Sequence, residues 1–230
     1  MSAQVDRQRA ALNRIAKEDP ELAARLILMT LPGAASKIPG TLTYVLDVDG
    51  VGAHRVSVSG GRARVDPAAD GDGHDADFRL HADPRTLADL VTGARGPLGL
   101  MMRGRLRIRG KRRKARKLRK LSSGALSMAD VVEAGGTLDP DILYRSLPYM
   151  IEPDWTQGHS FTVKYVVTGE RGGTWYVMVR DGEPLVVTRE EREAVGTATV
   201  SFDTYQRMAS GQLSPSMACL LYTSDAADEL

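Results

Sequence analysis

Residues 93–110, GARGPLGLMMRGRLRIRG, form the stretch that decides the fold. From residue 104 onward, small or apolar residues alternate with charged ones. Gly104, Leu106 and Ile108 share one parity, and the other is held by Arg103, Arg105, Arg107 and Arg109. A period of two belongs to a strand with one face in the core and the other in solvent. The stretch therefore predicts a half-buried strand with a cationic outer face, preceded by an apolar patch of Leu98, Leu100, Met101 and Met102.

The densest charge run of the chain follows directly. Residues 103–120 hold twelve Lys and Arg and no acid, whereas the whole chain of 230 residues holds 31 basic and 29 acidic residues. The chain is thus a mildly acidic body with one basic patch, and its 42% hydrophobic content suffices for a core. It contains no apolar run of about 18 residues, the length that a membrane-spanning helix needs. With no recognisable signal peptide, the predicted location is the cytoplasm.

The residues before this stretch predict alternating helices and strands. Helices are expected over residues 6–18 and 20–31 and between Asp83-Pro84 and Gly93, because Asp-Pro is an N-cap signal and Gly a C-cap signal. Pro32 is expected to end the second of these helices. Strands are expected over residues 42–48, 54–58, 62–65 and 76–81.

The same order of signals begins again at Asp139-Pro140. A helix is expected up to Pro148, followed by strands over residues 161–167 and 197–202 that flank a glycine hairpin after Gly172. Asp203 is expected to cap a further helix. The predicted organisation is an N-terminal helical extension (1–19), a first domain (20–121), a linker (122–138), an incomplete second domain (139–218) and an artefact tail (219–230).

The tail is assigned from its back-translation. Residues 219–229 can be encoded by a sequence that resembles a transposase adapter of sequencing libraries. The prediction is that residues 219–230 have no biological meaning and that the second domain is truncated after Ala218. Cys219, the single cysteine of the chain, would then fall outside the natural sequence.

Several weak signals in this order resemble the sterol carrier protein type-two family. They are Gly40-Thr-Leu-Thr-Tyr-Val-Leu, the Gly60-Gly61 hairpin, Ala76-Asp-Phe-Arg-Leu, Leu87 to Gly93, and Met101 to Gly110. The resemblance covers roughly residues 20–121, and more weakly 139–218. It implies an α+β fold with a mostly antiparallel five-stranded sheet and helices on one face, in two tandem copies of which the second is truncated. It also implies an apolar tunnel that binds sterols, acyl chains or other lipids.

The predicted function is non-catalytic binding, and in some settings transfer, of such a ligand. The candidate lining residues are Leu26, Met29, Leu87, Leu90, Leu100, Met101, Leu106 and Ile108. The alternative for each of them is plain core packing. No catalytic motif, cofactor fingerprint or metal-ligand spacing is present, because the calcium-like loop at 70–81 has Asp75 where Gly is needed and His81 where Glu is needed. No enzyme activity, cofactor or metal is therefore expected, although some relatives of the family are accessory domains of enzymes.

The basic run departs from the family, in which an amphipathic helix often closes the tunnel. Here the helix has only Ala115, Leu118 and Leu121 as apolar residues. Three readings stay open: a solvated helix face, contact with an anionic membrane or lipid headgroups, and contact with nucleic acid. The competing function is thus a basic-helix interaction module that binds nucleic acid, an anionic membrane or a partner protein. The candidate contact residues are Lys111, Arg112, Arg113, Lys114, Arg116, Lys117, Arg119 and Lys120.

Overall fold

The computed structural model describes residues 3–69, 75–120 and 127–214. The predicted adapter-derived tail and the tip of the acidic loop at 70–74 lie outside the described residues. The chain divides into two compact units, Met1–Gly136 and Thr137–Leu230. Each unit has its own sheet and its own helices.

The first unit opens with two helices and then alternates strands and short helices. In chain order its elements are α1 (Ala3–Glu18), α2 (Pro20–Ala35), β1 (Leu42–Val48), β2 (Gly52–Ser59), β3 (Arg62–Pro67), β4 (Phe78–Ala82), α3 (Pro84–Thr92), α4 (Pro97–Met102), β5 (Leu106–Gly110), α5 (Arg112–Ala115), the 3-10 helix η1 (Arg116–Lys120) and α6 (Met128–Glu133).

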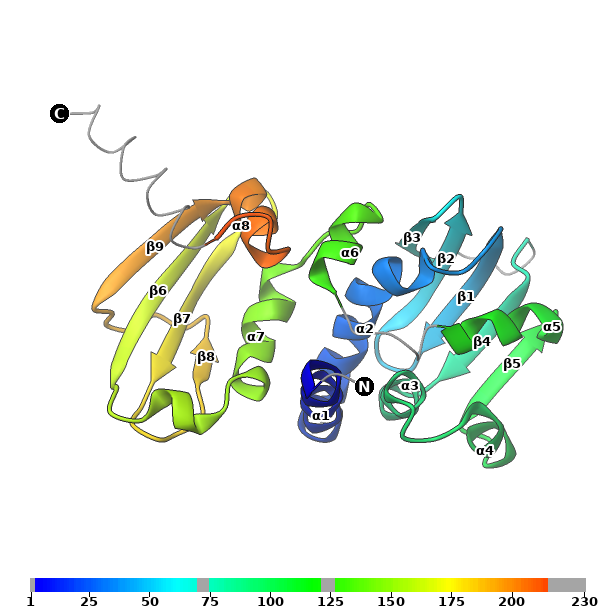
Figure 1. Cartoon of the computed structure of the whole chain (residues 1–230), viewed down its shortest axis with the longest axis horizontal. Helices are drawn as coiled ribbons and strands as arrows, with labels where there is room; N and C mark the ends of the chain where they lie inside the picture. The colour runs from blue at the N-terminus through cyan, green and yellow to red at the C-terminus, as the bar shows by residue number, and fades with distance from the viewer. Residues whose placement is uncertain (1–2, 70–74, 121–126, 215–230) are drawn as a thin grey trace. The chain divides into compact units, whose positions relative to one another are not determined.

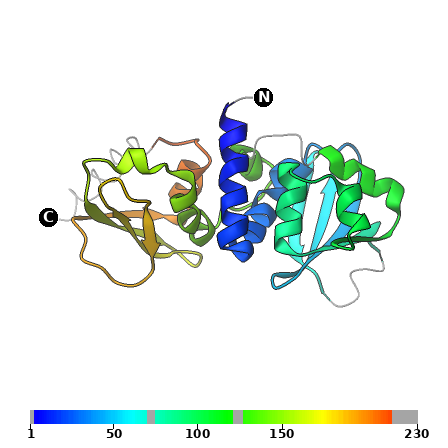
Figure 2. The same cartoon turned by 90° about the horizontal axis from the view of Figure 1, so that it is seen from below.

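The sheet of this unit has the order β3-β2-β1-β4-β5. The pairs β1–β2, β2–β3 and β4–β5 are antiparallel, and only β1–β4 is parallel. Helices α2, α3 and α5 lie on one side of it (Figures 1 and 2). The predicted α+β class, with a mostly antiparallel five-stranded sheet and helices on one face, is confirmed.

The two faces of this sheet differ in chemistry as strand periodicity requires. Along β1, Leu42, Tyr44, Leu46 and Val48 are all buried on one face. The opposite face carries a row of directly paired residues, Asp66, Arg55, Val45, Arg79 and Arg109, that runs across all five strands. The core therefore lies on the helix side, and charged side chains cover the other.

The alternating side chains of residues 103–109 are buried and exposed as predicted. Leu106 is buried and Ile108 half-buried, whereas Arg103, Arg105, Arg107 and Arg109 are exposed. The preceding apolar patch forms the short helix α4, which the sequence analysis did not anticipate. Its signals were nevertheless present, because Pro97 occupies the first turn and Gly96 the N-cap.

The second unit repeats part of this plan. Its elements are α7 (Pro140–Met150), the 3-10 helix η2 (Pro153–Thr156), β6 (Phe161–Thr168), β7 (Gly173–Val179), β8 (Val186–Thr188), β9 (Gly196–Ser201) and α8 (Phe202–Ala209). The sheet order is β8-β7-β6-β9, with β6–β9 parallel and the other pairs antiparallel. These are the order and directions of β3-β2-β1-β4. Among the described residues, no strand pairs with β9 where β5 pairs with β4.

Three local expectations are corrected. Pro32 and Pro148 do not end their helices, because α2 continues to Ala35 and α7 to Met150. A proline in the last turn removes one N–H donor, and in α2 the buried residues after it compensate through packing. The N-cap of α8 is Ser201, whose side chain accepts from the Thr204 N–H, and not Asp203.

Part of the segment for which the sequence predicted a linker is helical. Helix α6 packs against α2. A Cβ on Gly33 would lie 2.8 Å from the backbone N of Val131, so the two backbones touch at this glycine. Lys37 Nζ also reaches Asp130 Oδ2 at 2.5 Å. These contacts place α6 in the first unit.

Candidate functional site

The eight candidate lining residues come from four elements of the first unit. Leu26 and Met29 lie on α2, Leu87 and Leu90 on α3, Leu100 and Met101 on α4, and Leu106 and Ile108 on β5. Leu90, Met101 and Ile108 are half-buried and the other five are buried. Six of the eight thus lie on helices, and the two on β5 share the sheet face of the buried β1 residues Leu46 and Val48. Burial alone does not separate ligand lining from core packing, so their role stays a prediction.

One polar group in this interior was missed by the sequence analysis. The side chain of Tyr44 is 1% exposed, and its hydroxyl has no hydrogen-bond partner. Burial raises the pKa of this hydroxyl, so Tyr44 is neutral and can both donate and accept. An unpartnered buried hydroxyl costs about 1–3 kcal/mol. A group that supplied the missing partner would recover part of that free energy.

Tyr44 is held in place by its neighbours on the sheet. Its ring stacks on Phe78, its direct partner on β4, with centroids 5.0 Å apart and planes at 8°. Its partner on the other side is Val56. The ring is therefore fixed among apolar groups, and the hydroxyl cannot reach solvent without disturbing the core.

The basic run differs from the single helix that the sequence predicted. It forms α5 and then η1, and three of its lysines bind within the first unit. Lys111 Nζ and Lys114 Nζ lie 3.1 and 2.7 Å from Asp77 Oδ1. Lys117 Nζ donates to the Pro39 carbonyl at 3.1 Å. Residues three apart are neighbours on one side of a helix, so the spacing of these lysines suits the helical turns of α5 and η1.

The remaining basic candidates divide into two groups. Arg113 and Arg116 are exposed. The side chains of Arg112, Arg119 and Lys120 lie outside the described residues. Among the described side chains of the segment, the two arginines are thus exposed, and the three lysines bind Asp77 and the Pro39 carbonyl.

Asp77 is the anchor for this segment. Its carboxylate also accepts from the Thr43 N–H at 3.3 Å, which joins β1 to the start of β4. The hydrogen bond from Lys114, with those from Lys111 and the Thr43 N–H, outweighs the burial of the carboxylate and lowers the pKa of Asp77 to about 2. The sequence placed Asp77 in an acidic loop and in the predicted strand over residues 76–81. It gave no sign of the partners of Asp77, which lie more than 30 residues away.

We expect Asp77→Asn to weaken the attachment of this segment. The free energy of unfolding at neutral pH should fall by about 1–2 kcal/mol, because two charge-assisted hydrogen bonds become neutral ones near solvent. The pKa is lower in the folded protein than in the unfolded chain, so this stability is present above the unfolded value of 3.8 and is lost as the pH falls towards about 2. Urea unfolding across that range measures it.

Asp66→Asn is the matched control, because the carboxylate of Asp66 pairs with the exposed Arg64. Its effect should stay within about 0.5 kcal/mol. If Asp77→Asn kept the full acid dependence of the wild-type protein, Asp77 would not be the anchor.

A model of the SCP-2 sterol transfer family matches residues 13–123. Residues 13–123 form an SCP-2 sterol transfer family domain. The match covers every element that carries the site: α2, the five strands, α3, α4 and the basic segment.

Solved structures similar to the chain include SCP-2 proteins. One is UbiJ-SCP2, a ubiquinone synthesis protein, with 18% identity over 43% of this chain and 88% of that chain, at a TM-score of 0.34. Another is sterol carrier protein 2 from Yarrowia lipolytica in its apo form, with 18% identity over 53% of this chain and 88% of that chain, at a TM-score of 0.29. A comparison with curated proteins found no match.

The interior of the second unit holds a cluster of aromatic rings, whereas the buried side chains of the SCP-2 domain are mostly aliphatic apart from Tyr44 and Phe78. Tyr144 on α7 stacks on Trp175 at 4.8 Å and contacts Tyr165 and Tyr205 at 5.4 and 6.2 Å between ring centroids. Because Tyr144 touches β6, β7 and α8, helices α7 and α8 cover the same face of the second sheet. Tyr205, like Tyr44, has a buried hydroxyl without a partner.

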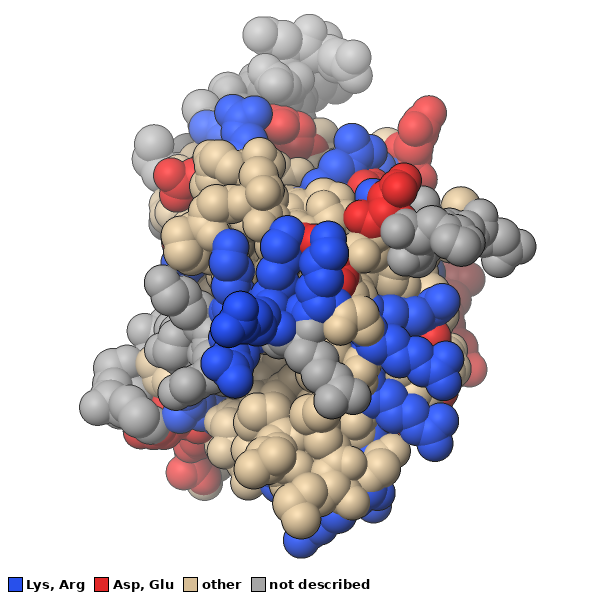
Figure 3. Space-filling model, turned by 90° about the vertical axis from the view of Figure 1, so that its right-hand side faces the viewer, with Lys and Arg blue, Asp and Glu red and all other residues tan. Residues whose placement is uncertain are grey.

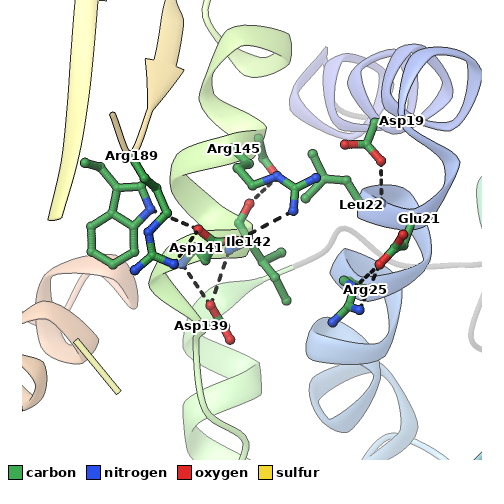
Figure 4. Close-up of polar contacts among 11 residues, drawn as sticks. Asp19, Glu21, Leu22, Arg25, Asp139, Asp141, Ile142, Arg145 and Arg189 are labelled. Carbon is green, nitrogen blue, oxygen red and sulfur yellow. Dashed lines mark hydrogen bonds and ion pairs between the residues drawn. The ribbon is translucent and has the colours of Figure 1, made fainter. Parts of the chain in front are cut away.

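A polar cluster fixes Trp175 beneath α7 (Figure 4). Asp139 caps the helix by accepting from the backbone N–H groups of residues 141 and 142. Asp141 Oδ1 accepts from Trp175 Nε1 at 3.1 Å and lies 3.6 Å from Arg189 Nη1. The Arg189 guanidinium stands 5.0 Å from the Trp175 ring centroid. Asp139, Asp141, Trp175 and Arg189 therefore each have a partner in this cluster, which suits a structural role.

Figure 4 also shows the start of α2 in the SCP-2 domain, where Asp19 accepts from the Leu22 N–H at 3.0 Å. The Asp-Pro signals at 19, 83 and 139 thus cap helices as predicted. In the part of the chain that the structure describes, no three His, Cys, Asp or Glu side chains are grouped to hold a metal ion. No described helix is long and apolar enough to cross a membrane.

Proposed function

We propose that the SCP-2 domain binds an apolar ligand, a lipid, sterol or acyl chain, between the sheet and helices α2, α3 and α4. The observation that carries the proposal is the unpartnered Tyr44 hydroxyl within an apolar interior. A hydroxyl or carboxyl group on the ligand would complete it. Burial of each ligand methylene would contribute about 0.8 kcal/mol, so the apolar part supplies most of the affinity.

Tyr44→Phe separates the polar anchor from the apolar contacts. The variant keeps the ring that stacks on Phe78 and removes only the hydroxyl. We expect affinity for dehydroergosterol and cis-parinaric acid to fall about fivefold, the worth of one hydrogen bond of about 1 kcal/mol. The free energy of unfolding of the ligand-free variant should stay equal or rise slightly, because an unpaired buried group is removed. Fluorescence titration of delipidated protein measures the affinities.

Tyr205→Phe is the matched control, because among the described residues it removes the other unpartnered buried hydroxyl, which lies in the second unit. It should leave both affinities unchanged. If Tyr44→Phe bound both probes as tightly as wild type, the hydroxyl would not contact the ligand. If the wild-type protein took up neither probe well above micromolar concentrations, the binding function itself would be wrong.

We propose further that the second unit is a copy of the same unit. The support is its sheet, which has the strand order and directions of β3-β2-β1-β4. Its aromatic interior, centred on Tyr144 and Trp175, fills the space between helix and sheet with large rings. We therefore assign ligand binding to the SCP-2 domain and a structural role to the second unit.

A further inference from the structure

Helix α4 of the SCP-2 domain presents two apolar side chains to solvent. Leu98 is 71% and Met102 is 82% exposed. They stand four residues apart and so lie next to each other on one side of the helix. Leu100, between them in sequence, is fully buried. The helix is therefore anchored from within and carries an apolar pair on its outside.

A row of exposed cationic residues follows this pair along the chain. Arg103 follows Met102 directly, and Arg105, Arg107 and Arg109 continue along β5 with their side chains exposed. Arg103, Arg107 and Arg109 have no acidic partner among the described residues. Arg105 interacts electrostatically with the Asp83 carboxylate. The space-filling view of this side of the unit shows Lys and Arg gathered around uncharged surface (Figure 3).

Tight backbone turns hold α4 and β5 together. The Arg105 N–H donates to the Leu100 carbonyl at 3.1 Å, and the Gly104 N–H donates to the Met101 carbonyl at 3.0 Å. Gly104 has a backbone φ of +69°, which residues with a side chain rarely adopt. Two backbone hydrogen bonds therefore close the turn between the apolar pair and the arginines of β5.

We propose that this surface, made by Leu98, Met102, Arg103, Arg105, Arg107 and Arg109, docks on an anionic lipid bilayer. Two exposed apolar side chains suit shallow insertion at the boundary of headgroups and acyl chains. Arginines beside them suit the phosphates of anionic lipids. A nucleic acid would use the arginines and leave the apolar pair without a function, so the bilayer explains both features.

The biological meaning of membrane docking rests on the proposed function, lipid binding by the SCP-2 domain. The vesicle-binding test does not depend on that function. Leu98 and Met102 face outwards from the same six-residue helix whose Leu100 and Met101 are predicted to line the ligand site. Docking would therefore bring a bilayer against the outer side of an element that covers the ligand. Ligand uptake in the absence of vesicles would not depend on it.

Vesicle co-sedimentation of the full chain tests the proposal. Wild-type protein should bind vesicles of phosphatidylserine and phosphatidylcholine and bind pure phosphatidylcholine much more weakly. The double variant Leu98→Ser, Met102→Ser should bind the anionic vesicles at least about tenfold more weakly, from the transfer free energy of two apolar side chains. Arg107→Gln and Arg109→Gln should each cost about fivefold.

Val195→Ser is the matched control, because Val195 is 79% exposed but follows the acidic residues Glu190, Glu191 and Glu193. It should bind as wild type. Equal binding of wild type and the Leu98/Met102 variant would overturn the proposal, as would equal binding to neutral and anionic vesicles. So would duplex DNA binding that the arginine variants weaken while vesicle binding stays unchanged. Titration with cis-parinaric acid without vesicles should give wild-type affinity for every variant, which separates this surface from the ligand site.

Discussion

Trp175→Ala is expected to unfold the second unit at denaturant concentrations at which the SCP-2 domain stays folded. Trp175 is 1% exposed, and its ring fills the space between α7 and the sheet. Loss of a buried aromatic side chain of this size costs about 3–5 kcal/mol. The change also deprives Asp141 of the indole N–H and Arg189 of the ring beneath it.

Urea unfolding followed by far-UV circular dichroism measures this effect. The variant should show an early transition for the second unit and an unchanged later one. Trp155→Ala is the matched control, because Trp155 is 81% exposed and its loss should cost less than about 0.5 kcal/mol. Trp155 and Trp175 are the two tryptophans of the chain, so tryptophan emission in wild type reports on the second unit alone. A Trp175→Ala protein that unfolds at the wild-type urea midpoint would contradict the account of this core.

Gly110→Ala is expected to destabilise the SCP-2 domain by about 2–5 kcal/mol. Gly110 has φ +105°, and a Cβ there would lie 2.8 Å from the Asp77 carbonyl oxygen and 2.9 Å from Phe78 Cα. The positive φ costs about 1–2 kcal/mol for a residue with a side chain, and displacement of packed backbone costs about 1–3 kcal/mol more. The clash falls on the start of β4, where Phe78 holds Tyr44 and Asp77 holds the basic segment.

Gly104→Ala is the control for this prediction. Gly104 also has a positive φ, of +69°, but a Cβ there would meet no atom within 4 Å. It should therefore show only the conformational cost of about 1–2 kcal/mol. Thermal unfolding of both variants gives the comparison, and equal losses would mean that the contact of β5 with β4 at Gly110 is not tight.

The sequence predicted the elements whose periodicity is strict. The alternation at residues 104–110 gave both the strand β5 and the orientation of its arginines, because a period of two fixes the two faces of a strand. Strand β1 was predicted with the bounds that the structure has. The Asp-Pro pairs located three helix starts, since an Asp cap and a first-turn Pro act within one turn.

The predicted helix ends were less accurate, because they depended on local stop signals such as proline. Pro32 and Pro148 looked like helix ends, yet each helix continues beyond its proline. In α2, the buried residues Gly33 and Ala35 pack there. Helix α4 was missed because six residues are too few to show a helical period. Its importance lies in the exposure of Leu98 and Met102, which an apolar patch in a sequence would place in the core.

The sequence supplied only apolar candidates for the ligand site, and their role as lining residues stays a prediction. The resemblance pointed to elements that do cover one face of the sheet, but the unpartnered Tyr44 hydroxyl results from how β1 packs under the helices. The pairing of Asp77 with Lys111 and Lys114 joins residues 34 and 37 positions apart. For the same reason, the charge run looked like a free cationic helix when three of its lysines bind inward.

Uptake of a fluorescent lipid by the delipidated full chain is the measurement that tests the central claim most directly. Titration with cis-parinaric acid or dehydroergosterol should saturate at about one ligand per SCP-2 domain, with affinity set by methylene burial of about 0.8 kcal/mol each. Tyr44→Phe should shift the titration curve to higher ligand concentration, and Tyr205→Phe should leave it unchanged. No saturable binding of either probe, at concentrations well above micromolar, would contradict the account.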